Sequence, residues 1–424
     1  MKKITLSNGI PVILEHMPST KVITILILFK VGSRNETKSI NGISHFLEHL
    51  FFKGTTNRPT TLEITKELDG VGADFNAFTS KDYTGYYVKV ANRHAKLAID
   101  ILEDLLFHPI FDPKEIDRER GVIIEEINMY EDNPMATAEE LAEQLMYGAD
   151  HPLGFRIAGP KENILKVTRK QIMKYRDTYY HPKNMVIVMT GNLPKNTAQT
   201  IKKHFGQAPK SRAATPRQKK FTEKQQQSRL HVYNKKTAQS HLALNFPSVT
   251  YTAKDYYVAQ VMATILGGNM SSRLFINVRE RQGVCYYIRA GISPYEDMGT
   301  LSIQAGFDTA RIHQAIEAII AELVTMRVAE VSDEELHQAK EYIRGKMYLR
   351  LEDSENVAWR WAKTALFEKQ LHDVSAEEKA LQQVTKQQVL ALAQKTLVAM
   401  HANLVIVGPY TKTQEKSFLK HLRF

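Results

Sequence analysis

His45-Phe-Leu-Glu48-His49 is the stretch around which the rest of the sequence is organised. In a helix with 3.6 residues per turn, His49 lies roughly 40° from His45, and Glu48 lies roughly 60° to the other side. All three side chains therefore reach one point. Two neutral imidazoles at this spacing are half of a common zinc site, and a carboxylate beside them that is not a ligand can deprotonate a metal-bound water. The pattern H-x-x-E-H is the inverzincin signature. Its alternative is a solvated helix face with two surface histidines.

A second stretch, from Asp117 to Tyr130, offers a third ligand for the same site. It predicts a helix whose apolar side holds Ile116, Ile123, Ile127 and Tyr130. Glu119 and Glu126 are seven residues apart on this helix, which is nearly two turns, so their carboxylates share a face. Glu125 points about 100° away from Glu126. A carboxylate from the shared face would complete a three-ligand site.

Together these stretches resemble the pitrilysin family of zinc metallopeptidases, which includes insulin-degrading enzyme and the mitochondrial processing peptidase. In that family a glutamate ligand follows the H-x-x-E-H motif by roughly 75 to 80 residues, and another functional glutamate precedes that ligand by about seven. Glu126 lies 77 positions after His49 (126 − 49). The resemblance implies that His45, His49 and Glu126 hold Zn²⁺, that Glu48 is the general base, and that Glu119 assists beside the ligands.

Further segments carry the resemblance along most of the chain. They are Gly42-Ile-Ser-His45, Phe51-Phe-Lys-Gly-Thr55, Asn76-Ala-Phe-Thr79, His151-Pro-Leu-Gly154 and Gly267-Gly-Asn-Met-Ser-Ser-Arg-Leu-Phe275. One departure is Ser44, where relatives usually have alanine. The resemblance implies that an extended peptide pairs with an edge strand near the zinc, and Asn76, Ala77 and Phe78 match that strand. The alternative is an interior strand in which Asn76 turns a bend.

Two residues of the second half, Arg279 and Tyr286, are candidates for catalysis. Family members carry an arginine and a tyrosine seven residues apart in this segment, and these reach the substrate near the zinc. An arginine fork and a phenol can both donate hydrogen bonds to a carbonyl oxygen that gains negative charge. Without that resemblance, the two side chains would be interpreted as a surface arginine and a half-buried tyrosine.

The sequence divides into two halves of similar length. With 424 residues, of which 43% are hydrophobic, the chain can build two cores. A basic stretch rich in proline and glutamine, Lys210 to Lys220, reads as an exposed linker. We therefore predict a catalytic domain at 1–208, a linker at 209–228 and a second domain at 229–424. The predicted fold class is α+β, with two homologous domains that each pack helices on an antiparallel-rich sheet.

An internal match supports this duplication. Phe111–Glu119 resembles Val331–Ala339 at an offset of 220 positions (331 − 111). With that offset, the counterpart of Glu119 is Ala339 and the counterpart of Glu126 is Lys346, whose protonated amine cannot bind zinc. The second half also lacks an H-x-x-E-H motif. One zinc ion per chain is expected.

The net charge of +11 and the pI near 9.3 raise the possibility of an anionic partner. Much of this charge lies in the linker, and no stripe of aromatic residues interleaved with lysine and arginine follows it. We expect no nucleic-acid partner. The longest apolar run, Val22–Phe29, is far shorter than a membrane span, so no membrane association is expected. The single Cys285 fits a reducing compartment, which favours the cytoplasm.

The resulting hypothesis is a zinc metalloendopeptidase that cleaves peptides or unfolded polypeptide segments inside a closed chamber. The chain has about half the domains that such a chamber needs in this family, so a homodimer is expected, and a heterodimer with a homologous chain is the other possibility. Two alternatives stay open. One is a non-catalytic or partner-dependent subunit of a processing peptidase, and the other is a basic binding protein whose metal is incidental.

Overall fold

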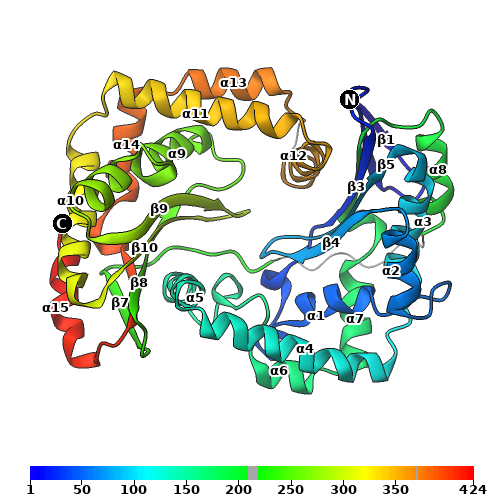
Figure 1. Cartoon of the computed structure of the whole chain (residues 1–424), viewed down its shortest axis with the longest axis horizontal. Helices are drawn as coiled ribbons and strands as arrows, with labels where there is room; N and C mark the ends of the chain where they lie inside the picture. The colour runs from blue at the N-terminus through cyan, green and yellow to red at the C-terminus, as the bar shows by residue number, and fades with distance from the viewer. Residues whose placement is uncertain (209–217, 369–370) are drawn as a thin grey trace. The chain divides into compact units, whose positions relative to one another are not determined.

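The computed structural model describes residues 1–208, 218–368 and 371–424, which form two compact units (Figure 1). The first unit takes its described residues from Met1–Ile127, Phe155–Lys219 and Tyr348–Leu371. The second takes them from Asn128–Gly154, Lys220–Met347 and His372–Phe424. Each unit combines a mixed sheet with helices, so the predicted α+β class is confirmed.

The first unit is built on a six-stranded sheet in the order β1-β2-β6-β3-β5-β4. The strands are β1 (Lys2–Thr5), β2 (Pro11–His16), β3 (Val22–Phe29), β4 (Asp74–Thr79), β5 (Thr84–Ala91) and β6 (Met185–Gly191). Only β2 and β6 pair in parallel, and the other pairs are antiparallel. β3 is a run of aliphatic and β-branched residues buried along nearly its whole length, as expected of a central strand covered on both faces.

The second unit repeats this arrangement with five strands in the order β7-β11-β8-β10-β9. They are β7 (Arg229–Asn234), β8 (Gln239–Ser248), β9 (Cys285–Pro294), β10 (Gly299–Asp308) and β11 (Asn403–Gly408). Here β7 and β11 are the parallel pair, and the remaining pairs are antiparallel. The two orders coincide strand by strand when β1 is left out, so the predicted duplication is confirmed at the level of topology.

Helices cover both sheets. Those of the first unit are α1 (Ile43–Phe51), α2 (Thr61–Asp69), α3 (Ala95–Phe107), α6 (Lys161–Lys166), α7 (Arg169–Tyr179), α8 (Thr197–Phe205) and α12 (Ser354–Phe367). Those of the second are α5 (Pro134–Tyr147), α9 (Tyr256–Ala263), α10 (Ile312–Val328), α13 (Val374–Gln382), α14 (Lys386–Thr396) and α15 (Glu415–Leu419). α4 (Pro113–Asp132) and α11 (Asp333–Leu351) each begin in one unit and end in the other.

The two halves of the sequence exchange one helix each, which the predicted boundaries of 1–208 and 229–424 do not include. α12 comes from the second half and packs on β3 and β6, where the Ser354 hydroxyl lies 2.9 Å from that of Thr24. α5 comes from the first half and packs on β8 and β11, where Ala138 and Ala142 join Ala243 in one apolar cluster. Each sheet therefore has one face covered by a helix from the other half.

Two further predictions concern the linker and membrane association. Residues 209–217 of the predicted linker lie outside the described residues, and 218–228 contain no helix or strand. Among the described helices, none combines the length and the apolar character that crossing a bilayer requires.

Candidate metal centre

The H-x-x-E-H residues lie on α1, as the sequence predicted. The helix begins after Gly42, whose φ of 101° is in the left-handed region that favours glycine. A Cβ at this position would lie 2.6 Å from the Ala158 carbonyl oxygen, so the chain needs glycine here for two reasons. His45 is buried, while Glu48 and His49 are half-buried. The side chains of the motif are therefore only partly accessible to solvent.

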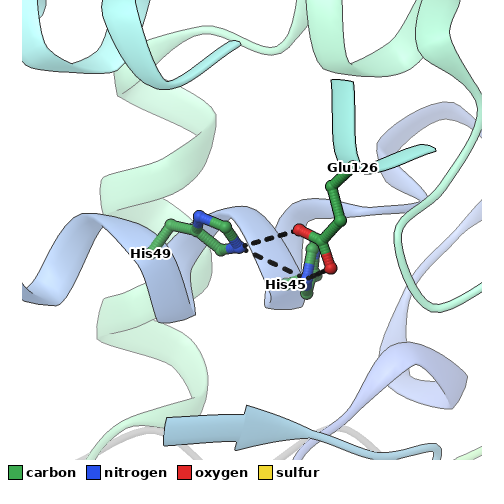
Figure 2. A group of neighbouring side chains, drawn as sticks. All are labelled: His45, His49 and Glu126. Atoms are coloured by element: carbon green, nitrogen blue, oxygen red, sulfur yellow. Dashed lines mark hydrogen bonds and ion pairs between the residues drawn. The ribbon is translucent and has the colours of Figure 1, made fainter. Parts of the chain in front are cut away.

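Glu126 from α4 meets the two histidines (Figure 2). Its carboxylate oxygens lie 3.5 Å from His45 Nε2 and 3.3 Å from His49 Nε2. The two Nε2 atoms are 3.4 Å apart. Within the described part of the chain, these three residues are the group of metal-binding side chains whose ligand atoms all converge.

These separations fit a tetrahedral zinc site. With bonds of about 2.0 to 2.1 Å, the ligand atoms of a tetrahedral site are about 3.3 Å apart, which is close to the separation of the two Nε2 atoms. Each Nε2 atom lies at a similar distance from one Glu126 oxygen, Oε1 for His45 and Oε2 for His49. Two imidazoles and one carboxylate also form a ligand set that leaves a fourth position for water in catalytic zinc sites. Hydrogen bonds from His45 and His49 hold the pKa of Glu126 well below its usual range, so the carboxylate is charged.

Glu119 orients His49 by bonding Nδ1, the ring nitrogen that does not face Glu126. Its Oε1 lies 2.9 Å from His49 Nδ1 and its Oε2 lies 2.7 Å from Lys53 Nζ, and the side chain is almost fully buried. Burial lowers the pKa of His49, but the hydrogen bonds to Glu119 and Glu126 and the charge of Glu48 outweigh it and raise the pKa to about 9. The three carboxylates around His49 therefore favour a positive charge at this position.

Glu48 is held by a residue that the sequence analysis did not single out. The Thr79 hydroxyl donates a 2.6 Å hydrogen bond to Glu48 Oε2. Thr79 is the last residue of β4, the strand at one edge of the first sheet. The bond leaves Oε1 of Glu48 as the oxygen that can accept a proton. Thr79 belongs to a segment that carries the family resemblance, but no spacing in the sequence relates it to Glu48.

The phase of α4 matches the prediction except at its end. Ile116, Ile123 and Ile127 are buried, while Glu125 is exposed. The prediction for Tyr130 was wrong, because this side chain is 42% exposed. It follows the last buried turn of α4, and Met129 beside it is exposed as well.

The predicted substrate strand is β4 itself. Asn76 is exposed, and its side-chain oxygen accepts a 2.9 Å hydrogen bond from the Ala77 amide. Ala77 is buried in the core of the first unit. Phe78 stacks on Trp359 of α12 with ring centroids 4.3 Å apart. β4 is the last strand in the sheet order, so none of the described strands pairs with its outer edge. The Phe78 ring lies across Gly85 of the neighbouring strand β5.

Arg279 and Tyr286 lie in the second unit. Arg279 is near the end of a π-helical segment, η7 (Leu274–Arg281), with its guanidinium 4.6 Å from the ring centroid of Phe275. Tyr286 is 71% exposed at the start of β9. Both are accessible, so neither is a structural core residue, and their action on a substrate stays a prediction.

Known families match the chain in two adjacent parts. Residues 11–161 match the family described as insulinase (peptidase family M16), and residues 166–343 match the peptidase M16 inactive domain. Among curated proteins, the uncharacterized zinc protease YmxG of Bacillus subtilis is 36% identical over 412 residues, which cover 96% of this chain and 98% of the relative. An uncharacterized zinc protease of Streptomyces coelicolor is 32% identical over 98% of this chain and 91% of its own.

Solved structures share the fold at lower identity. A protease from Helicobacter pylori aligns with a TM-score of 0.91 at 24% identity, over 96% of this chain and 99% of its own. A chain of Complex III from Candida albicans aligns with a TM-score of 0.82 at 14% identity, over 99% of both chains. At these identities the likeness is one of fold.

Proposed function

The chain belongs to the insulinase (M16) family of peptidases, and from that premise we propose that it is a zinc-dependent endopeptidase of peptides or unfolded polypeptide segments. The observation that carries the proposal is the convergence of His45, His49 and Glu126 with Glu48 on the adjoining turn. Relatives named zinc proteases support the choice of metal.

In this proposal His45, His49 and Glu126 hold the zinc ion. When bound, zinc supplies Lewis-acid chemistry: it lowers the pKa of a coordinated water towards ~7 and polarises the scissile carbonyl. Glu48 accepts the proton of the attacking water and later gives it to the leaving amine. Thr79 holds one carboxylate oxygen of Glu48, so the other oxygen faces the proton that moves.

The substrate is proposed to bind as an added strand on the free edge of β4, next to Asn76, Ala77 and Phe78. Main-chain hydrogen bonds would then supply affinity without demanding a sequence, which suits a peptidase of unfolded segments. Thr79 ends this strand, so it joins the substrate edge to the general base. Arg279 and Tyr286 are proposed to donate hydrogen bonds to the carbonyl oxygen as it gains charge.

We expect the active assembly to be a homodimer that encloses the substrate in a chamber, located in the cytoplasm, with no nucleic-acid partner. The other candidate is a non-catalytic or partner-dependent subunit, which the inactive-domain match over residues 166–343 favours. The complete ligand set of the first unit favours the peptidase, because a subunit without catalysis has no need to keep Glu48 beside three converging ligands.

The test is hydrolysis of a quenched fluorescent peptide by the purified chain. We expect cleavage that a chelator abolishes and that added Zn²⁺ restores, with about one zinc ion per chain by elemental analysis. A chain that binds zinc and cleaves nothing alone, but cleaves when a homologous partner is added, would favour the partner-dependent subunit. A chain that binds no zinc and cleaves nothing would overturn the peptidase and favour the non-catalytic subunit.

A further inference from the structure

The two histidines of the candidate metal centre are supported in different ways. The ring of His49 is held from behind by Glu119, which bonds its Nδ1 atom. The Nδ1 atom of His45 is buried and has no hydrogen-bond partner among the described residues. The direction of the His45 ring therefore depends on the backbone from which it projects, which is the first turn of α1.

That first turn has an unusual cap. Its N-cap is Gly42, which has no side chain to accept hydrogen bonds from the first amides of the turn, for which the helix itself has no acceptor. Glu36, six residues upstream, supplies the acceptor instead. Its Oε2 receives the Gly42 amide at 2.8 Å, and its Oε1 receives the Ser44 amide at 2.8 Å. The Asn41 side chain adds a third bond of 2.8 Å to Oε2.

Glu36 is almost fully buried, with 3% of its surface exposed. A buried carboxylate is costly unless donors surround it, and here its donors come from the chain just before His45. Its negative charge also lies at the positive end of α1. Ser44 extends the network, because its hydroxyl lies 2.8 Å from that of Tyr175 on α7. The unusual Ser44 is thus part of the same buried network.

We propose that Glu36 is a positioning residue of the metal centre: its carboxylate fixes the first turn of α1 and thereby the direction in which His45 presents Nε2. Glu36 does this for His45 through the backbone, as Glu119 does for His49 through a side chain. The inference rests on the proposed zinc site and adds a residue that lies outside the H-x-x-E-H motif and its ligands.

The experiment compares Glu36→Gln with Glu63→Gln. Glu63 is a control for helix capping at an exposed position, because its side chain also bonds at a helix start, where it accepts the Thr60 amide at 2.8 Å in the capping box of α2. Zinc affinity is measured by competition with a chelating dye, and Co²⁺ absorption reports the ligand geometry. We expect Glu36→Gln to weaken zinc binding about 10-fold to 100-fold and to change the Co²⁺ spectrum, and Glu63→Gln to change neither.

A pH series separates positioning from a general loss of stability. Burial raises the pKa of Glu36 to about 7, against the opposing effect of its hydrogen bonds. The titratable groups whose charge couples to it are Tyr175, Tyr179 and Tyr180, whose raised pKa values keep them neutral in this range. Between pH 8 and pH 6 Glu36 gains a proton and its advantage over glutamine should shrink. Protonation of the histidines affects both proteins and cancels in the ratio of their affinities.

Equal zinc affinity and equal Co²⁺ spectra in a folded Glu36→Gln protein would overturn the inference. If Glu36→Gln does not fold, Glu36→Asp replaces it, and parental affinity in that variant would be equally decisive. Failure of the proposed function looks different, because the parent itself would then bind no zinc or cleave no peptide.

Discussion

α4 and α11 are counterparts in the two halves of the chain, yet of these two helices only α4 contributes a residue to the converging group of His45, His49 and Glu126. Both begin after a buried apolar residue, Phe111 in one and Val331 in the other. Where α4 has the buried Glu119, α11 has the buried Ala339. Where α4 has the proposed ligand Glu126, α11 has Lys346, whose ammonium lies 5.8 Å from the ring centroid of Tyr342.

The difference shows which part of the duplicated fold is free to change. The strand order is the same in both units, because sheet pairing and core packing depend on apolar residues that both halves keep. α11 has neither glutamate on the corresponding face, yet the second unit has the same strand order. A buried carboxylate such as Glu119 is retained only where partners compensate its burial, and His49 and Lys53 do so in the first unit.

The strongest test of this contrast is to replace Glu48, the proposed general base of the first unit. Glu48→Gln keeps the shape of the side chain but cannot accept the proton, so we expect peptidase activity to fall about 10³-fold. Zinc content should equal that of the parent, since Glu48 is not among the converging ligands. Activity and zinc are measured on the same preparation. A Glu48→Gln protein that still cleaves at the parental rate would disprove the assignment of the base.

The ligand on α4 can be compared with its neighbour and with its counterpart on α11. Glu126→Gln should weaken zinc binding by at least about 100-fold, because a direct ligand matters more than the groups that support it. Glu125→Gln and Lys346→Gln should leave the affinity unchanged, because Glu125 is exposed on another side of α4 and Lys346 belongs to the second unit. Calorimetric titration with Zn²⁺ measures all three variants. Equal losses at Glu125 and Glu126 would show that the phase of the helix is wrong.

In place of a metal, the second unit is predicted to contribute Arg279 and Tyr286. Replacing Arg279 with alanine and Tyr286 with phenylalanine should lower activity about 100-fold with zinc content unchanged, as expected for lost hydrogen bonds to the carbonyl oxygen. If these residues serve the zinc site of the other chain, mixing this variant with Glu48→Gln should restore about a quarter of parental activity. Half of the dimers would be mixed, and each would have one intact site of two.

Complementation needs proof that subunits exchange, for which a different affinity tag on each variant is sufficient. Mixed dimers without activity would mean that the pair acts within its own chain or has no catalytic role. A monomer in solution would contradict the homodimer before any mixing is done.

The local parts of the site were predictable from the sequence, because a helix fixes the geometry of residues three, four and seven apart. His45, Glu48 and His49 follow from one turn of α1, and Glu119 and Glu126 follow from two turns of α4. The duplicated fold was predictable for a similar reason, since the match between the halves is visible at one offset.

The contacts between distant segments were not predictable in this way. The apolar pattern of α5 and α12 shows that each helix has a face to bury, but it does not show which sheet receives that face. The bond from Thr79 to Glu48 depends on how closely β4 approaches α1 in the folded chain. Glu36 is close to α1 in sequence, but an acceptor six residues before an N-cap residue has no periodic signature.

The smallest expected effect concerns the buried Glu119, whose counterpart Ala339 needs no partner at all. Burial raises the pKa of Glu119, but its bonds to His49 and Lys53 outweigh burial and lower it, so the carboxylate is charged. Glu119→Gln replaces the charged acceptor of His49 Nδ1 with a neutral and weaker one, and it also removes the ion pair to Lys53. We therefore expect zinc affinity to fall about tenfold, with a smaller loss in Lys53→Met, which removes only the ion pair. Titration with Zn²⁺ at constant pH measures both, and a larger loss in Lys53→Met would mean that the ion pair, and not the bond to His49, positions the ligand.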